Sequence, residues 1–467
     1  GPRTGHVANI NGSVEFDNDN SGVRETFLAV GPGGTTGESF VNSGDDEVQY
    51  EISGDYALDL PLYGLDGRLK LNGLLSRKDK QRDTIFVTAP QGQTPTRAIF
   101  LRDQQQGETI GRAEYGFKAS EDHDVQLSVE YAFNSLDSTT TFENNFTAPI
   151  LDTVRVEEDR YNIRATDSWQ INPDLSLQTS VGAEYSRLQV TEPRSEARTF
   201  FRPKGLMSLS YKLSDRYSVR AQAERGVGQL NFGTFVSTRN LVENQQTTGN
   251  AEIKPNQFWN LSMEFERTDD QLFSGRISPF YRIIQDPIDR ILFPDGSEGP
   301  GNLDQASRYG IQANATLLFD TIGAPGLRVE ASGEIGDSKI DDPLTSESRQ
   351  INGNEEWDYN IFARYDMPGT DFAFTARASN DQGSPVLRLD DIREVVVDKP
   401  FVSLSIIHKN FFGMQLTVSG TNLLDNSIEQ ERQRFDGPDL RLGDRTLIER
   451  FARQRGRRLS ITLTDVF

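Results

Sequence analysis

The segment from Val125 to Phe133 reads Val-Gln-Leu-Ser-Val-Glu-Tyr-Ala-Phe, with an apolar side chain at nearly every second position. Successive side chains of a β-strand point to opposite faces of the sheet, so this segment predicts a strand with one apolar and one polar face. The same alternation returns from Leu175 to Tyr185 and recurs to the end of the chain. Short turns rich in Asn, Asp, Pro and Gly alternate with long polar connections. These features predict an all-β fold, a large antiparallel transmembrane β-barrel with about 18 strands.

The composition agrees with a barrel and argues against several other classes. Only 35% of the 467 residues are hydrophobic, which suffices for a barrel because only alternate residues face lipid. The chain has no run of about 18 apolar residues and therefore no transmembrane helix. A net charge of −21 argues against a nucleic-acid partner. Acidic clusters such as Asp45-Asp46-Glu47 are interpreted as solvated loop surface; the alternative is a negative mouth that attracts cations or holds divalent ions against lipopolysaccharide.

The N-terminal part is harder to divide into strands. Residues 17 to 45 and 80 to 97 are interpreted either as extra strands or as long loops. The barrel pattern nevertheless begins close to residue 1, so residues 1–467 are expected to form one outer-membrane barrel. Aromatic residues near the short-turn ends predict a girdle at one membrane interface: Trp169, Tyr211, Tyr217, Phe319, Tyr365 and Phe372.

The last strand carries an assembly signal. It presents apolar side chains at alternate positions, follows a glycine, and ends in an aromatic residue at the carboxyl terminus. This pattern resembles the sorting signal of bacterial outer-membrane proteins, which implies the outer membrane as the location and its lipid and the barrel-assembly machinery as partners. The residues that carry it are Gly456, Leu459, Ile461, Leu463 and Phe467.

Four short motifs, in this order and spacing, resemble the TonB-dependent receptors. The first is Glu-Arg-Gly-Val-Gly-Gln-Leu-Asn-Phe at residues 224–232, followed by a long connection and Gly-Asn-Ala-Glu-Ile-Lys-Pro at residues 249–255. Asn302 followed by Arg308-Tyr309-Gly310 is similar to the start of a family strand, and Thr421-Asn422-Leu423-Leu424-Asp425 is similar to the end of one.

The resemblance carries expectations about function. It implies an outer-membrane transporter whose external loops capture a small solute, such as a siderophore, a vitamin or an oligosaccharide. Family barrels have about 22 strands around a plug, and the TonB complex acts through that plug. Neither a plug domain nor a TonB box is expected within residues 1–467, so the chain is interpreted as the barrel portion of a receptor.

Two sets of functional residues are predicted. The long connection after residue 228 and the strand end before it are expected to contact the solute, through Arg225, Gln229, Asn231, Phe232, Phe235, Asn240 and Asn244. Alternation places a second set of charged residues toward the lumen, where they either set selectivity or simply fill the bore: Arg164, Glu184, Arg220, Glu224, Glu264 and Arg276.

Other functions remain as alternatives. A passive porin or a structural or adhesive surface barrel has the same alternation. An enzyme is not expected, because the chain has only three histidines and no partnered Ser-His arrangement is visible. No catalytic residue, metal ligand or cofactor is assigned.

Overall fold

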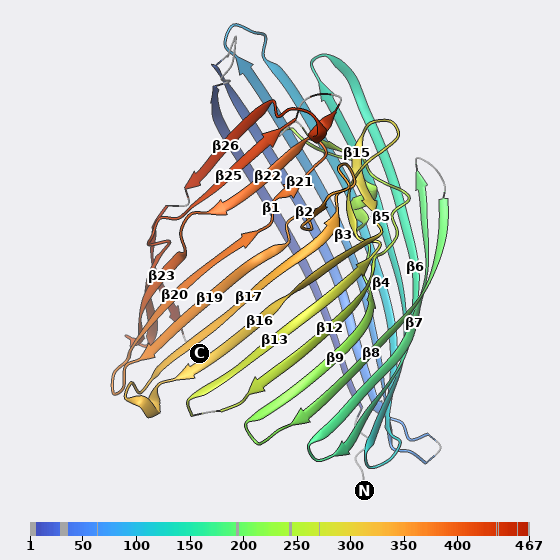
Figure 1. The fold of residues 1–467 in the computed structure, drawn as a ribbon, viewed down its shortest axis with the longest axis vertical. Coiled ribbons are helices and arrows are strands. Elements are labelled where there is room, and N and C mark those ends of the chain that lie inside the picture. The colour runs from blue at the N-terminus through green and yellow to red at the C-terminus, as the bar shows by residue number, and fades with distance from the viewer. Residues whose placement is uncertain are drawn as a thin grey trace.

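A computed structural model describes residues 6–28, 36–62, 64–192, 196–241, 245–269, 271–435, 437, 439–454 and 456–465. Long antiparallel strands form a curled sheet (Figure 1). Its principal strands are β1(Val7–Leu28), β2(Thr36–Asp59), β3(Gly67–Pro90), β4(Thr96–Lys118), β5(His123–Asn144), β6(Thr147–Asn172), β7(Leu175–Glu192), β8(Glu196–Lys212), β9(Tyr217–Val227), β12(Gln257–Arg267), β13(Phe273–Gln285), β16(Gln305–Leu318), β17(Leu327–Asp341), β19(Glu355–Asp366), β20(Phe372–Gly383), β23(Phe401–Phe411), β24(Met414–Thr421) and β27(Arg458–Asp465).

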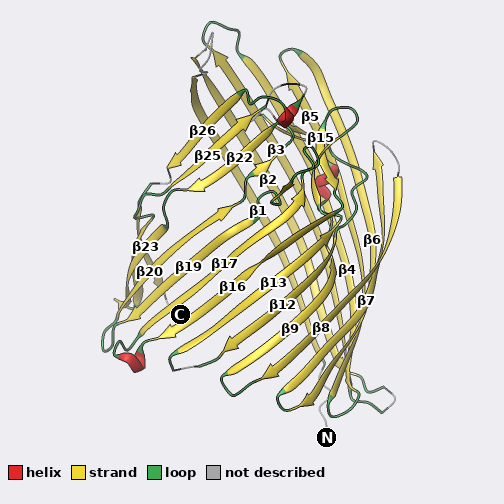
Figure 2. Ribbon diagram, viewed as in Figure 1, coloured by secondary structure: helices red, strands yellow, loops and turns green. Residues whose placement is uncertain are grey.

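Most of the shorter elements lie in the long connections, whereas η2(Asp320–Ile322) lies in the short turn between β16 and β17 (Figure 2). The strands are β10(Thr238–Asn240), β11(Gln245–Thr247), β14(Ile288–Leu292), β15(Glu298–Asn302), β18(Ser348–Arg349), β21(Val386–Leu387), β22(Asp391–Val397), β25(Ser427–Arg434) and β26(Leu447–Gln454); the 3₁₀ turns are η1(Phe232–Phe235), η2(Asp320–Ile322) and η3(Leu440–Leu442). Strands β21, β22, β25 and β26 form a separate four-stranded sheet.

The main sheet contains 19 strands, one of which is the two-residue β18. The others follow one another as a meander, each pairing antiparallel with its neighbours in the chain. The all-β fold and the predicted strand number are therefore confirmed. Within the described residues, no ladder joins β1 to β27, so the first and last strands of the curled sheet are each paired on one side only.

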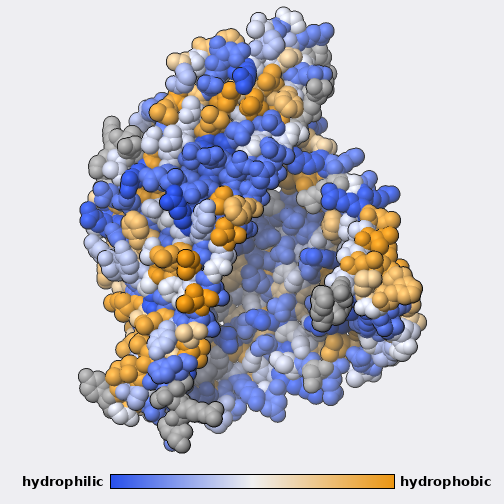
Figure 3. Space-filling model, turned by 180° about the vertical axis from the view of Figure 1, so that it is seen from behind, coloured by the Kyte–Doolittle hydropathy of each residue, from blue (hydrophilic) through white to orange (hydrophobic). Residues whose placement is uncertain are grey.

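The two faces of the sheet differ as the alternation predicts. On the outer face, Val129 and Ile163 lie opposite each other and are each 56% exposed. Their chain neighbours Glu130 and Arg164 point to the inner face. The space-filling view from behind shows a deep hollow with a largely hydrophilic inner surface, beside orange patches on the outside (Figure 3). The sheet thus encloses a polar bore and presents an apolar surface outward.

Two rows of aromatic residues border the apolar outer surface. Near the short turns, the rings of His123 and Trp169 stack at 5.3 Å, and Tyr211 and Tyr217 are exposed on the same side. Toward the long connections, Tyr161 contacts its cross-strand neighbours, Tyr131 at 5.0 Å and Tyr185 at 6.4 Å. The β5 segment between the rows, residues 123–131, has the length of about nine residues with which a tilted strand crosses a bilayer.

The ambiguous N-terminal segments are strands. Residues 17 to 28 continue β1, residues 36 to 45 belong to β2, and residues 80 to 90 end β3. The alternation fades there because both faces carry polar side chains, such as the paired Asp45 and Arg82. An antiparallel ladder needs no apolar face where both sides meet water, so the strands continue beyond the apolar band.

The polarity of the two faces is inverted in the upper part of β5, β6 and β7. The inward residues Leu136 and Val156 are fully buried at 0% exposure, whereas Asp137 faces outward and is exposed. Leu188 and Val190 of β7 continue the inward apolar patch at 1% and 2% exposure. An apolar surface inside the bore must be covered by another part of the chain.

Candidate functional site

The connection between β9 and β12 covers this inward apolar patch. Phe235, Val236 and Ile253 of the connection are buried against Leu136 and its neighbours on the wall. Leu230 and Phe232 pack against the same cluster. We call the described part of residues 228–256 the inner loop. Apolar burial holds the inner loop inside the mouth of the bore.

Polar contacts fix the end of the inner loop. Arg198 on β8 donates hydrogen bonds to the carbonyl oxygens of Ala251, Glu252 and Ile253, the last at 2.9 Å. Asn302 donates to the carbonyl oxygen of Lys254 at 2.9 Å and accepts from its backbone N–H at 3.0 Å. These bonds satisfy backbone groups of the inner loop that take no part in a β-ladder.

Asn250 and Gly249, which belong to the second sequence motif, have clear structural roles. Asn250 donates to the carbonyl oxygen of Pro300 at 2.8 Å and accepts from the backbone N–H of Glu252 at 2.8 Å. Gly249 lies so close to the backbone of Phe235 that a Cβ atom at this position would collide with it. The motif therefore serves to close the inner loop against the β14–β15 hairpin.

A polar pocket of about 340 Å³ lies between the inner loop and the inner wall. The inner loop contributes Gln229, Leu230, Asn231 and Phe232. The wall contributes two buried charged residues, Glu158 and Arg160, each 7% exposed, together with amide and hydroxyl groups. The wall residues are Gln49, Ser76, Lys78, Gln106, Gly107, Glu108, Asn134, Ser135, Glu158 and Arg160.

An aromatic pocket of about 400 Å³ lies beyond η1, on the other side of the inner loop. Phe100, Phe142 and Phe235 line it, and the guanidinium of Arg239 lies 3.7 Å from the centre of the Phe142 ring. Burial lowers the pKa of Arg239 from its usual value, although this group stays positive at any physiological pH. The aromatic pocket thus offers ring faces and one cation to a solute.

Some of the predicted solute-binding residues line a pocket, and others do not. Gln229, Asn231 and Phe232 line the polar pocket, and Phe235 lines the aromatic pocket. Asn240 ends β10 beside Arg239, and Asn244 lies outside the described residues.

Arg225 is separated from both pockets. It pairs in register with Trp259 and lies 5.7 Å from that ring on the outer face of the sheet. Strand alternation explains the difference: an odd-numbered residue of β9 points outward, as Ala221 and Ala223 do.

The charged residues expected in the lumen lie on the inner face by strand parity. Glu184 binds Lys204 at 2.5 Å, and Glu264 binds Arg276 at 3.1 Å. Arg220, Glu264 and Arg276 line a third pocket of about 270 Å³ on the wall formed by β9, β12, β13 and β16. Arg164 and Glu224 lie on the inner face outside the three pockets described here.

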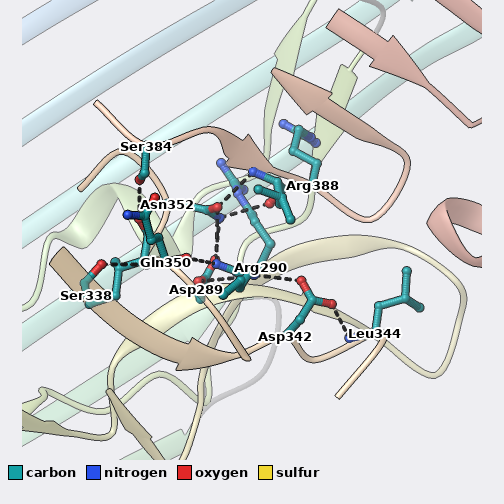
Figure 4. A network of polar contacts seen from close by, with 12 residues as sticks. Asp289, Arg290, Ser338, Asp342, Leu344, Gln350, Asn352, Ser384 and Arg388 are labelled. Atoms are coloured by element: carbon teal, nitrogen blue, oxygen red, sulfur yellow. Dashed lines mark hydrogen bonds and ion pairs between the residues drawn. The ribbon is translucent and has the colours of Figure 1, made fainter. Parts of the chain in front are cut away.

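A buried polar network ties the long connections together (Figure 4). Arg349 binds Asp289 at 3.0 Å and Asp342 at 2.7 Å, and Asn352 donates to Asp289 at 2.8 Å. Arg441 donates a further hydrogen bond to Asp342 at 2.7 Å. These contacts join three connections, those after β13, β17 and β24. We call this set of residues the loop network; the alternation gave no signal for it.

Asp342 is the most strongly perturbed acid of the loop network. Burial by itself would raise the pKa of Asp342, but hydrogen bonds from the backbone of Thr345 and from Arg349 and Arg441 outweigh it and lower the pKa to about 2. Asp342 is therefore a permanently charged anchor at neutral pH.

The predicted assembly signal lies on the last strand. Leu459, Ile461 and Leu463 are 76%, 69% and 53% exposed and lie on one face of β27. Gly456 precedes the strand with a positive φ of 71°, a conformation that favours glycine. Phe467 lies outside the described residues.

The described part of the chain offers neither a cluster of metal ligands nor a helix suited to span a membrane. Among these residues, no group of three or more His, Cys, Asp or Glu side chains is arranged to hold a metal ion. No helix in the same residues has the length and apolar character that a membrane span requires.

Known structures share the fold. The ferric yersiniabactin uptake receptor FyuA from Yersinia pestis is 12% identical over 98% of this chain and 76% of its own, with a TM-score of 0.58. The copper transporter OprC is 11% identical over 90% of this chain and 77% of its own, with a TM-score of 0.55. The pyoverdine receptor FpvA from Pseudomonas aeruginosa is 10% identical over 92% and 76%, with a TM-score of 0.54. At such identities the likeness concerns the fold alone.

Comparison with curated proteins gives no match. The family model described as "TonB dependent receptor-like, beta-barrel" matches residues 3–398, which is most of the chain. Together with the meander of long strands around a polar bore, this match shows that the chain belongs to the family of TonB-dependent receptor β-barrels.

Proposed function

We propose that this chain is the barrel of a TonB-dependent transporter in the bacterial outer membrane and that it takes up a small solute. The observation that carries the proposal is the inner loop, which folds into the mouth of a family barrel and leaves a polar and an aromatic pocket against the wall. A solute that enters from the long-connection end meets these pockets first.

The two pockets suit capture because they offer different contacts on either side of η1. Asn231 and Gln229 supply amide donors and acceptors in the polar pocket, whereas Phe235 supplies a ring face in the aromatic pocket. Pockets near 300 Å³ and above are of the usual size for small-molecule sites. The anchored ends of the inner loop reduce the ordering cost of binding, which favours affinity.

The proposal includes several parts that stay predictions. The barrel is expected to occupy residues 1–467 and to couple to the TonB complex through a plug domain outside them. Its outer face is expected to contact outer-membrane lipid and lipopolysaccharide. The barrel-assembly machinery is expected to insert it, guided by the strand that carries Leu459, Ile461 and Leu463.

Deletion of the gene in its natural host tests the proposal. Loss of uptake of one solute from a panel of ferric siderophores, corrinoids and oligosaccharides, restored by the wild-type gene only when TonB is active, would support it. Uptake that is restored equally without TonB would identify a passive pore instead. Unchanged uptake of the whole panel would contradict the proposal.

Single substitutions connect uptake to the polar pocket. Phe232→Ala is expected to reduce uptake at unchanged surface level, because it removes a ring that lines the pocket. Phe146→Ala is the matched control, since Phe146 lies at the tip of the β5–β6 hairpin and is 70% exposed. Equal uptake by the two variants would exclude the polar pocket as the capture site.

A further inference from the structure

Four arginines line the third pocket on the inner wall, which we call the arginine pocket. Arg220 comes from β9, Arg276 and Arg282 from β13, and Arg308 from β16. They surround a volume of about 270 Å³ within a chain whose net charge is −21. Positive charge is therefore concentrated at one place of a protein that is acidic as a whole.

Two of the four arginines have carboxylate partners. Arg276 binds Glu264 at 3.1 Å, and Arg308 binds Glu334. Arg220 donates through Nε to the hydroxyl of Ser210 at 3.0 Å. Arg282 donates through Nε to the side-chain oxygen of Asn260 at 3.4 Å, and Arg220 lies opposite Glu264 in register. In the described part of the chain, no carboxylate lies within 4.0 Å of the guanidinium of either Arg220 or Arg282, so the four arginines form only two ion pairs.

The strand register brings two of the positive charges close together. Arg282 lies directly opposite Arg308 on the neighbouring strand, and both point into the bore. Like charges at directly opposed positions of a sheet repel one another. Arg282 is held 5.0 Å from the centre of the Phe258 ring and Arg308 5.5 Å from that of Phe280, so the rings help to keep both guanidinium groups in place.

An oxyanion relieves this repulsion and matches the donor geometry. Guanidinium groups bind carboxylate and phosphate oxygens through paired N–H donors. Neutral amides and hydroxyls complete the lining and can bind the remaining oxygens or neighbouring hydroxyls: Gln222, Asn260, Ser262, Ser278, Gln312 and Asn314. The pocket therefore combines two arginines that are hydrogen-bonded only to neutral groups with a polar lining.

We propose that this arginine pocket binds a carboxylate or phosphate group of the transported solute. The inference rests on the proposed function and adds that the solute is anionic. On β12, the inward Glu264 alternates with the outward apolar residues Met263 and Phe265, which are 41% and 43% exposed. The arginine pocket thus lies at the level of the apolar band, along the path that a solute takes across the membrane.

Binding of simple anions to the purified protein in detergent tests the site without any need for uptake. Isothermal titration with citrate, inorganic phosphate and glucose is expected to give binding for one or both anions, weakened by added salt, and none for glucose. Binding of phosphate alone assigns the site to free inorganic phosphate or a phosphate ester, and binding of citrate alone assigns it to a polycarboxylate. Absence of binding for both anions overturns the inference.

Charge-neutral variants locate the binding. Arg282→Gln and Arg220→Gln are each expected to weaken anion binding about tenfold or more, the effect of losing one hydrogen bond to a charged group. Arg112→Gln makes the same charge change on the inner face of β4, away from the pocket, and is expected to leave the affinity nearly unchanged. If all three variants weaken anion binding equally, the anion responds to the total charge of the bore and not to this pocket, and the inference is wrong.

Two further results separate this inference from the proposed function. Arg282→Lys keeps the charge and is expected to restore only part of the affinity, because lysine cannot bind in a forked geometry. Heat-dependent gel mobility reports whether each variant is folded. If the protein binds anions but shows no TonB-dependent uptake, the proposed transport function is wrong and the anion site stands. If the protein takes up a neutral solute and Arg282→Gln has no effect on that uptake, the anion site is wrong and the proposed transport function stands.

Discussion

Arg349 is the residue on which most of the loop network depends. Its guanidinium lies between the carboxylates of Asp289 and Asp342, and its side chain is only 10% exposed. Removal of Arg349 would leave the buried Asp289 without its arginine, whereas Asp342 would keep Arg441. The network can therefore be tested one residue at a time.

Arg349→Ala is expected to destabilise the packing of the long connections by about 3–5 kcal/mol, the usual cost of removing one partner from a buried ion pair. Hydrogen exchange of residues 286–304 and 342–354 measures the loss. Arg450→Ala is the control, because the Arg450 side chain is 77% exposed and its ion pair with Glu431 lies at the surface, where such pairs contribute little to stability. Equal exchange in both variants would contradict a central role of Arg349.

Asp342 gives the loop network a defined pH dependence. Its pKa falls from the usual 3.8 to about 2 in the folded protein, so its stabilisation is fully present above pH 4 and is lost as the pH falls through about 2. The shift corresponds to about 2 kcal/mol. Hydrogen exchange of the same segments, corrected for intrinsic rates, is expected to rise between pH 4 and pH 2, and Asp342→Asn should remove this part of the rise.

At the scale of elements, the inner loop and the upper strands form one structural unit. The wall residues Val154 and Val156 alternate with the outward Arg155 and Glu157, which bind each other at 2.6 Å on the outside. Apolar residues therefore face inward where the inner loop lies and outward where lipid is expected. The polarity of each strand face therefore matches the polarity of the surface that it contacts.

Ile253→Ala tests this unit. Ile253 is fully buried at 0% exposure, so its truncation is expected to destabilise the inner loop by about 2–5 kcal/mol through lost burial and a cavity. Faster hydrogen exchange of residues 249–256, with unchanged heat-dependent gel mobility, is the expected result. Ile163→Ala on the outer face, 56% exposed, should leave that exchange unchanged. A change of the same size in both variants would contradict local packing of the loop.

For the sheet as one body, the apolar band between the aromatic rows is the surface that is expected to lie in the membrane. Val129 on β5 is 56% exposed within this band, and its neighbour Ser128 points into the bore. Adjacent residues of one strand thus point to the apolar outer face and to the polar bore.

Leu127→Arg, at the middle of the segment 123–131 and next to Ser128, is expected to destabilise the membrane-inserted barrel by about 2–4 kcal/mol, because Leu127 is 46% exposed on the outer face and a charge at the bilayer midplane faces lipid. Ser128→Arg places the same charge in the aqueous bore and is expected to cost much less. The fraction of folded protein after refolding into lipid vesicles, followed by gel mobility, measures the difference. Equal yields from the two variants would contradict the assignment of the faces.

Much of the fold follows from the sequence because strand alternation is a local property. The apolar and polar positions around Val129 predict the strand, its faces and the antiparallel meander, and the strand number agrees with the sheet. The charged lumen residues, including Glu264 and Arg276, follow from the same parity rule. Arg225 illustrates the limit: its motif suggested a solute contact, whereas parity places it beside Trp259 on the outer face.

The two faces of each strand follow from the order of its residues alone, because apolar and polar side chains alternate within the strand. The folded chain alone shows where the inner loop packs, which acids share Arg349, and that Arg282 and Arg308 lie opposite each other. These contacts join residues that are distant in the chain, such as Arg441 and Asp342. No local pattern records such contacts, since they depend on register and on the curvature of the whole sheet.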